Sequence, residues 1–166
     1  MNNEVTILIH KTNACRLLDQ KKLAYTLHEY PIDEKHLDAV HVASETGQNP
    51  AKIYKTLVTI GDKTGYAVAA IPANKSLNLK AFAKISGNKK VEMIHVNDLE
   101  KITGYIRGGC SPIGMKKAFP TFIDQAAKQF DTIFISAGKR GLQIEMNADD
   151  LLLATRGQYA DISVEQ

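Results

Sequence analysis

The feature that most constrains the fold is a pair of β-rich runs separated by a short loop with a glycine at each end. Residues 53–60 (IYKTLVTI) and 66–71 (YAVAAI) flank the segment 61–65 (GDKTG). β-branched and aromatic residues favour strands, and a loop of this length between two strands is typical of a β-hairpin. We therefore predict an antiparallel pair of strands over residues 53–71.

The other segments show helical and strand patterns in no regular order. Helices are predicted where apolar residues recur at helical spacing after a capping residue, and strands where β-rich runs end at a turn, glycine or proline. The predicted helices cover 12–22, Asp38 to Gly47, Asn78 to Gly87, 97–103 and a last one that Asn147 opens, and the predicted strands cover 24–30, 90–94, 121–123, 132–136 and 142–146. Because strict βαβ alternation is missing, we expect an α+β fold with a mixed or barrel-like sheet.

Length and composition fit one compact domain. With 166 residues and 44% apolar side chains the chain can bury a substantial core, so we expect a single domain over 1–166. No run approaches the roughly 18 apolar residues of a membrane helix, and the first residues, MNNE, lack the basic region of a secretory signal. Cys15 and Cys110 lie outside any CxxC pair, which fits a reducing compartment. We expect a cytoplasmic protein that does not bind membranes.

The charge balance limits the kinds of partner. Lys and Arg number 21 against 18 Asp and Glu, so the net charge is only +3, and aromatic residues make up 7%. Proteins that bind nucleic acid generally use a strongly basic surface or a platform of aromatic side chains. The sequence therefore argues against a DNA-binding protein, but it allows a local basic patch that contacts one RNA end.

The densest unusual segment is 107–114 (RGGCSPIG), which we call the glycine loop. Two adjacent glycines and a proline impose an irregular backbone that side chains do not cover. Such a backbone can direct N–H groups at a carbonyl oxygen and stabilise the negative charge that develops there during acyl transfer. The alternative is a tight surface turn, and the glycine content alone does not decide between the two.

Lys55 is unusual because it lies within an apolar strand. Strand alternation places it on the same face as Ile53, Leu57 and Thr59. It could orient a phosphate, ribose or carbonyl group at the mouth of a pocket. The alternative is a lysine on an edge strand whose side chain extends into water.

Other candidate residues have plainer explanations. A nucleophilic thiol at Cys110 would need a base or a positive charge beside it, and the alternative is a small loop residue. Asp149 and Asp150 fall in the first turn of a predicted helix, where carboxylates complement the helix dipole. Lys139 and Arg140 form a hairpin tip that could contact phosphates or only water.

Standard cofactor and metal motifs are missing from the sequence. GxxxxGK[ST], GxGxxG and GxSxG do not occur, and the five histidines show neither HxxxH nor HExxH spacing. We therefore expect no cofactor and no metal site.

The glycine loop and its flanks resemble a known family. Residues 103–117 (TGYIRGGCSPIGMKK) closely resemble the signature loop of the YbaK/EbsC editing family. Four more segments follow in the family's order, namely 54–57 (YKTL), 77–80 (LNLK), 89–93 (KKVEM) and 136–142 (SAGKRGL). The resemblance extends over residues 12–162 and implies a mixed-sheet, barrel-like α+β domain.

This resemblance implies a function. The family is related to the editing insertion of bacterial prolyl-tRNA synthetase, and its YbaK branch removes cysteine wrongly attached to the proline tRNA. It implies a trans-editing deacylase for Cys-tRNA(Pro), with Cys-tRNA(Cys) as a further candidate substrate. In this branch the thiol of the substrate attacks its own ester carbonyl, so the protein mainly supplies positioning. The implied partners are the 3′ acceptor end of the aminoacyl-tRNA and a prolyl-tRNA synthetase.

The resemblance also implies a set of site residues. Lys55 would hold the terminal adenosine of the tRNA, and Gly109 with Pro112 would form the family's GxxP loop. Backbone N–H groups near Gly109 would face the developing oxyanion. The implied catalytic residues are Lys55 and Gly109, and the implied substrate-binding residues are Tyr30, Cys110, Ser111, Pro112, Ser136 and Asp150.

Two alternative functions stay open. Relatives in the same superfamily clear alanine or serine by attack of water or a ribose hydroxyl, so another small amino acid could be the substrate. A noncatalytic module that binds tRNA or a synthetase is the alternative from a different class. Release of different amino acids from charged tRNA distinguishes these alternatives from Cys-tRNA editing.

Overall fold

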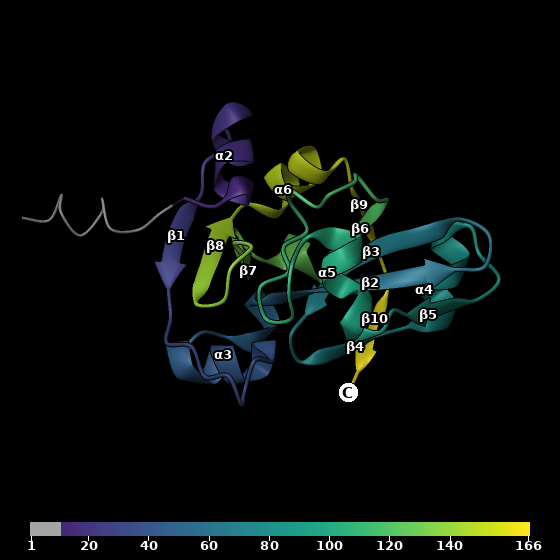
Figure 1. Ribbon diagram of the computed structural model, residues 1–166, viewed down its shortest axis with the longest axis horizontal. Helices are drawn as coiled ribbons and strands as arrows, with labels where there is room; N and C mark the ends of the chain where they lie inside the picture. The colour runs from purple at the N-terminus through teal and green to yellow at the C-terminus, as the bar shows by residue number, and fades with distance from the viewer. Residues whose placement is uncertain (1–10) are drawn as a thin grey trace, which may run out of the picture.

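The computed structural model describes residues 11–166 and contains a mixture of short helices and strands (Figure 1). The helices are α2 (Asn13–Gln20), α3 (Ala39–Thr46), α4 (Leu79–Ser86), α5 (Val96–Thr103) and α6 (Ala148–Thr155), with 3₁₀ helices η1 (Pro50–Lys52) and η2 (Gln125–Gln129). The strands are β1 (Thr26–Glu29), β2 (Tyr54–Gly61), β3 (Gly65–Pro72), β4 (Lys75–Leu77), β5 (Val91–Met93), β6 (Thr121–Asp124), β7 (Ile133–Ser136), β8 (Leu142–Met146), β9 (Gln158–Ala160) and β10 (Ser163–Glu165). Among the described residues, no helix is both long and apolar enough to cross a membrane.

The largest sheet has five strands in the order β5-β2-β3-β6-β9. The predicted hairpin is confirmed, because β2 and β3 pair antiparallel from Tyr54 opposite Pro72 to Gly61 opposite Gly65. The pairs β3–β6 and β6–β9 are parallel, so the sheet is mixed. Figure 1 shows this sheet with α4 and β5 at one end of the molecule and the β1-β8-β7 strands towards the other.

The remaining strands form a three-stranded antiparallel sheet, β1-β8-β7, and a two-stranded pair, β10-β4. A single bridge between Ile53 and Phe134 connects the start of β2 with β7. The predicted mixed α+β fold is confirmed. The strands of the described chain do not close into a barrel, because this one bridge replaces a continuous ladder between the two larger sheets.

The helix boundaries follow the predicted capping residues. The carboxylate of Asp38 accepts the N–H of His41 at 2.7 Å, and α3 ends at Gly47 with φ of +71°. Asn78 caps α4 and Asn147 caps α6 in the same way, through side-chain oxygens that accept backbone N–H groups. Each cap satisfies a donor that the first turn of a helix leaves without a partner.

The buried side chains form three clusters. The largest joins α2, α6 and the β1-β8-β7 sheet around residues such as Leu18, Ile135 and Ile144. A second cluster lies between α4 and the main sheet. The third is small and consists of Ala43, Ile53, Ala73 and Phe134. It packs α3 against the start of β2, and so determines how these two elements face each other beside the candidate site.

Candidate active site

A cavity of about 230 Å³ opens where α3, β2 and the glycine loop meet, and we call it the Lys55 cavity. Five parts of the chain contribute lining residues: the segment after β1, the start of α3, the first half of β2, the glycine loop, and strands β7 and β8. The lining residues are Tyr30, Leu37, Asp38, Ala39, Val42, Ile53, Tyr54, Lys55, Thr56, Leu57, Arg107, Gly108, Cys110, Ser136 and Gln143. The structure therefore brings together segments that lie more than a hundred residues apart in the sequence.

Lys55 is half-buried in this cavity, at the second residue of β2. Its ammonium group donates a hydrogen bond to the carbonyl of Ala73 at 3.2 Å. Burial lowers the pKa of Lys55, because removal from water disfavours the charged form, and the nearby carboxylate of Asp38 partly opposes this shift. An ammonium group with a single protein acceptor keeps donors available for a ligand.

The glycine loop is held in place by side chains from neighbouring elements. The hydroxyl of Tyr105 donates a short hydrogen bond to the carbonyl of Ile113 at the far end of the loop. The guanidinium Nε of Arg140 donates to the carbonyl of Arg107 at 2.8 Å. The predicted hairpin tip thus contacts the loop through Arg140, an interaction that neither sequence-based alternative included.

The two adjacent glycines are required by close packing. A β-carbon on Gly109 would lie 3.1 Å from the backbone nitrogen of Arg140 and 3.2 Å from backbone atoms of Lys139. Gly108 has φ of +85°, and a β-carbon there would lie 3.3 Å from the side chain of Leu37. Larger residues would therefore push the loop away from the β7–β8 turn and from the segment before α3.

The backbone N–H of Gly109 already has a partner, because it donates to the carbonyl of Ile106 at 3.0 Å. Gly109 is buried and does not line the Lys55 cavity, whereas Gly108 and Cys110 on either side of it do. The predicted catalytic role of Gly109 stays a prediction. In this geometry the residue shapes the loop, and its neighbours present backbone to the cavity.

Cys110 lines the cavity, but its thiol is poorly suited to nucleophilic attack. Burial raises the pKa of Cys110 to about 12, and the hydrogen bond with Thr103 opposes this rise only in part. A nucleophilic cysteine needs a lowered pKa and an adjacent base or positive charge. At neutral pH the thiol is therefore protonated and forms a small apolar part of the cavity lining.

Tyr30 and Ser136, both predicted to bind substrate, lie on the cavity wall. The N–H of Tyr30 donates to the carbonyl of Gly141 at 2.9 Å, and burial raises the pKa of its phenol. The hydroxyl of Ser136 accepts the N–H of Gly138 at 3.1 Å. Both residues thus line the cavity next to strand ends that hydrogen bonds hold in place.

Ser111, Pro112 and Asp150 lie outside the lining of the Lys55 cavity. The buried hydroxyl of Ser111 accepts the N–H of Ile113 at 3.2 Å and so stabilises the turn of the glycine loop. Pro112 lines a second cavity, between the loop and the helices α2 and α6. Asp150 belongs to the first turn of α6, where its N–H donates to Asn147. Their predicted contacts with substrate stay predictions.

Several cavity residues were missed as site candidates in the sequence. Asp38 was identified only as a helix cap, yet it also lies beside Lys55. Arg107 was considered only as part of the loop, yet it lies exposed at the cavity. Gln143 is 4% exposed within an apolar strand. A polar residue in such a strand was the sequence signal that could have identified it as a site candidate.

This arrangement favours positioning over chemical attack by the protein. The lining of the Lys55 cavity contains the cations of Lys55 and Arg107, the carboxylate of Asp38, irregular backbone, hydroxyl and amide groups, and one protonated thiol. No histidine of the described residues 11–166 belongs to it. Such a set can bind an anionic or hydroxyl-rich end and stabilise an oxyanion. The site is therefore suited to binding and orienting a substrate rather than to attacking it with a protein nucleophile.

Comparison with known proteins identifies the class. The family model described as aminoacyl-tRNA editing domain matches residues 33–153, which include Lys55 and the whole glycine loop. A relative in Enterococcus faecalis, the candidate Cys-tRNA(Pro)/Cys-tRNA(Cys) deacylase EbsC, is 54% identical over 94% of this chain and 95% of its own. The chain therefore belongs to the aminoacyl-tRNA editing domain family, as its resemblance to the YbaK/EbsC proteins implied.

More distant matches share part of the sequence or the fold. A proline–tRNA ligase of Lactobacillus delbrueckii subsp. bulgaricus is 27% identical over 76% of this chain, which corresponds to only 22% of the ligase. The crystal structure of a candidate trans-editing enzyme for prolyl-tRNA synthetase superposes with a TM-score of 0.77 at 20% identity, covering 93% of this chain and 99% of the other. The hypothetical protein APE2540 gives a TM-score of 0.81 at 22% identity, covering 90% and 97%. These two structures support the fold alone.

Proposed function

We propose that this protein is a trans-editing deacylase that removes cysteine from mischarged Cys-tRNA(Pro), with Cys-tRNA(Cys) as a second candidate substrate. The main structural support is the Lys55 cavity, which is lined by a half-buried lysine, by the irregular backbone of the glycine loop and by a thiol that burial keeps protonated. The name of the relative at 54% identity supports the choice of cysteine.

The size of the cavity supports a small aminoacyl group. At about 230 Å³ it is smaller than the roughly 300–1,000 Å³ of sites for drug-sized ligands. The ammonium group of Lys55 would bind the terminal adenosine of the tRNA through its free donors. The amino acid would then lie against Cys110 and Ser136, with Tyr30 beside it.

The chemical step would use the substrate's own sulfur. The substrate sulfur attacks the ester carbonyl carbon, and the carbonyl oxygen gains negative charge in the tetrahedral intermediate. The C–O bond to the ribose then breaks, the ribose oxygen takes the proton that the thiol gave up, and cysteine leaves as a cyclic thiolactone that water opens. Holding the thiol near the carbonyl supplies much of the acceleration.

The stabilising groups for the oxyanion would come from the glycine loop. The N–H groups of Gly108 and Cys110 are the candidates, because both residues line the cavity while the N–H of Gly109 donates within the loop. Gly109 would act by letting the loop approach the β7–β8 turn closely. Removal of one such donor typically slows acyl transfer by about 100-fold to 1,000-fold.

A panel of charged tRNAs tests this function. The purified protein would be incubated with Cys-tRNA(Pro), Cys-tRNA(Cys), Ala-tRNA(Pro), Ser-tRNA and Pro-tRNA(Pro), and free tRNA would be measured over time. We expect rapid loss of cysteine and slow loss of the other amino acids. Faster loss of alanine or serine would assign a different substrate, and no loss from any tRNA would favour a binding module.

A second test uses the substrate's sulfur. tRNA(Pro) charged with 2-aminobutyrate nearly keeps the size of the amino acid, because a methyl group replaces the thiol, but it cannot form the thiolactone. We expect this substrate to resist deacylation. Equal rates for cysteine and 2-aminobutyrate would show that water attacks the ester, which would contradict the proposed chemical step.

We also infer that the whole chain works as one editing domain beside a prolyl-tRNA synthetase, in the cytoplasm where tRNA is charged. Support comes from the 27% identity to part of a proline–tRNA ligase. Addition of purified prolyl-tRNA synthetase should lower the KM for Cys-tRNA(Pro), and should leave that for Cys-tRNA(Cys) unchanged. An unchanged KM for both would remove the synthetase as a partner.

A further inference from the structure

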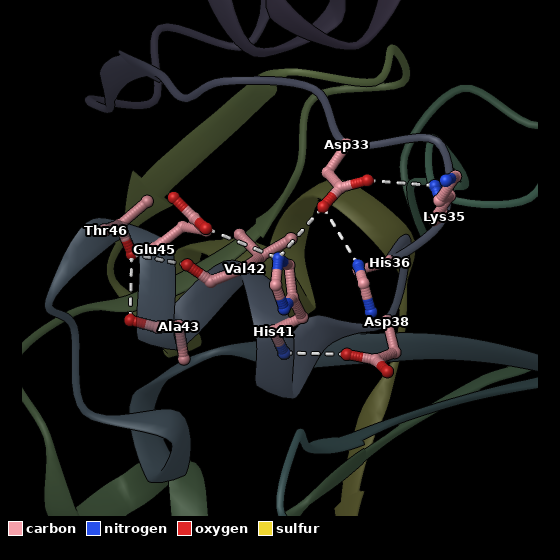
Figure 2. Close-up of polar contacts among 9 residues, drawn as sticks. All are labelled: Asp33, Lys35, His36, Asp38, His41, Val42, Ala43, Glu45 and Thr46. Atoms are coloured by element: carbon pink, nitrogen blue, oxygen red, sulfur yellow. Dashed lines mark hydrogen bonds and ion pairs between the residues drawn. The ribbon is translucent and has the colours of Figure 1, made fainter.

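Four side chains gather on the segment before α3 and on the first turns of that helix, and we call them the histidine cluster. They are Asp33, His36, His41 and Glu45, and Figure 2 shows their imidazole and carboxylate groups pointing toward one another. The Oδ2 of Asp33 lies 2.9 Å from His36 Nδ1 and 3.6 Å from His41 Nε2. Glu45 Oε1 lies 3.5 Å from the same His41 nitrogen.

His41 is the least satisfied member of this cluster. Its side chain is 27% exposed, and its Nε2 is buried without a hydrogen-bond partner among the described residues. The two nearest carboxylate oxygens lie beyond good hydrogen-bond distance. A buried imidazole nitrogen that faces two carboxylates without bonding to either leaves room for an atom between them.

The donor spacing fits a tetrahedral metal ion. Zinc binds imidazole nitrogen at about 2.0–2.1 Å and carboxylate oxygen at about 2.0–2.2 Å. Tetrahedral geometry then places neighbouring donors about 3.3–3.5 Å apart. The separations of 2.9 Å between Asp33 and His36 and 3.6 Å between Asp33 and His41 lie on either side of this range. One candidate ligand atom from each of Asp33, His36 and His41 lies within 4.8 Å of the others.

The imidazole rings of His36 and His41 lie next to each other. The rings of His36 and His41 stack with centroids 4.4 Å apart and an angle of 21° between their planes. A hydrogen bond between His36 and Asp33 explains one of the contacts, but it does not explain why His41 Nε2 also faces Asp33 and Glu45. A cation bound by Asp33, His36 and His41 would give the His41 nitrogen a partner, and Glu45 would lie next to it.

We propose that the histidine cluster is a binding site for Zn²⁺ or a similar divalent transition metal, with Asp33, His36 and His41 as ligands and Glu45 as a carboxylate beside His41. Imidazole suits these metals, whereas Mg²⁺ and Ca²⁺ prefer oxygen ligands alone. This inference departs from the sequence expectation that no metal site exists. The expectation depended on HxxxH and HExxH motifs on one helix, whereas here His36 precedes α3 and His41 lies within it.

The metal ion would connect the segment before α3 to the helix itself, in the wall of the Lys55 cavity. Between Asp33 and His41 lie Leu37, Asp38 and Ala39, which line that cavity. A cation held by residues before and within α3 would restrict the movement of this segment relative to the helix. The site would therefore stabilise the wall that carries Asp38 beside Lys55, without taking part in the chemical step.

Metal binding can be tested directly and independently of deacylation. Chelator-treated protein would be titrated with ZnCl₂ in a calorimeter. We expect one Zn²⁺ per chain, and a loss of affinity of at least about 100-fold in both His36→Ala and Asp33→Asn, because loss of a ligand costs at least as much as loss of its supporting contacts. His95→Ala, which removes another exposed histidine, should bind zinc like the wild type.

Hydrogen exchange gives a second readout. Addition of ZnCl₂ should slow amide exchange over residues 33–45 and leave the β2–β3 turn at 61–65 unchanged. MgCl₂ should produce neither heat nor protection. Absence of saturable zinc binding, equal affinity in His36→Ala, or equal binding of Mg²⁺ would each overturn the metal site. None of these results would alter the case for the deacylase.

Discussion

Lys55 shows how one residue acquires a functional environment from its neighbours. The strand pattern places it among apolar residues, and the structure adds the carboxylate of Asp38 from a different element. Burial lowers the pKa of Lys55 and a nearby opposite charge raises it, so the site keeps a cation with incomplete solvation. An ammonium group in this state is stabilised when a ligand supplies hydrogen-bond acceptors that water and the protein do not supply.

Lys55→Met tests this role at the residue scale. We expect deacylation to fall by about 100-fold, because hydrogen bonds from a charged group contribute roughly 1.5–3 kcal/mol. Lys63→Met, in the exposed β2–β3 turn, should retain full turnover. Unchanged turnover in Lys55→Met would remove this residue from the site.

The stability of the Lys55→Met variant should depend on pH differently from that of the wild type. Because the pKa of Lys55 is lowered on folding, the unfolded chain binds more protons between the two pKa values, and this group makes stability rise with pH. Thermal melting at several pH values should show the Lys55→Met variant at least as stable as the wild type at neutral pH. Its advantage should shrink as the pH approaches the ordinary range of lysine.

Cys110→Ala tests the protonated thiol. With a pKa raised to about 12 by burial, Cys110 supplies negligible thiolate at neutral pH, so we expect the variant to keep most of its turnover. Iodoacetamide should also alkylate the folded protein slowly and the unfolded protein quickly. A large loss of turnover in a folded variant would restore the nucleophile hypothesis.

At the scale of elements, the glycine loop depends on other elements for its conformation. It contains no regular ladder, and its ends are held by Tyr105 and by Arg140 from the β7–β8 turn. Gly138 in that turn also packs against the ring of Tyr105, where a β-carbon would lie 2.9 Å from Cε1. The loop, the tyrosine and the turn therefore form one structural unit.

Tyr105→Phe tests the connection between this unit and catalysis. Loss of the hydroxyl leaves the carbonyl of Ile113 without its donor, which typically costs about 1–3 kcal/mol for a buried group. We expect lower thermal stability and about tenfold slower turnover, because the loop becomes less well positioned. Tyr25→Phe, which removes an exposed hydroxyl bonded to Asp19, should change neither quantity appreciably.

Arg140 distinguishes loop positioning from phosphate binding. Arg140→Lys keeps the positive charge but loses the Nε donor that bonds to the carbonyl of Arg107. If Arg140 positions the loop, Arg140→Lys and Arg140→Ala should reduce kcat to a similar extent. Recovery of activity in the lysine variant would instead support a direct contact with tRNA phosphate. Lys139→Ala serves as the control, since its side chain is exposed beside the same turn.

At the scale of the whole molecule, the modest net charge of +3 predicts a limited RNA contact. Each neutralised phosphate contributes about 0.7 to the slope of log affinity against log salt for single strands. Arg107 lies exposed at the cavity, so Arg107→Ala should weaken tRNA binding and reduce this slope by about 0.7. Lys89→Ala, on the exposed turn before β5, should leave the slope unchanged. An unchanged slope in Arg107→Ala would place the RNA elsewhere.

Elements with a strong local sequence pattern could be predicted, whereas elements with a weak local pattern could not. The β2–β3 hairpin and the helices α3, α4 and α6 were predicted because their turns and caps are encoded within a few residues. The strands β4, β9 and β10 were missed. Each has three residues and exists only through pairing with a distant partner, as Val164 opposite Ser76 illustrates. Pairing of this kind leaves no periodic pattern in so short a segment.

The sequence by itself determined the local elements, the irregular backbone of the glycine loop and, through its resemblance to an editing family, the class of activity. Only the tertiary structure placed Asp38 beside Lys55, gave the Gly109 N–H a partner within the loop and raised the pKa of Cys110. It also brought His36 and His41 together with two carboxylates. The physical reason is that burial, charge proximity and hydrogen-bond partners depend on distances between segments, which spacing along the chain does not encode.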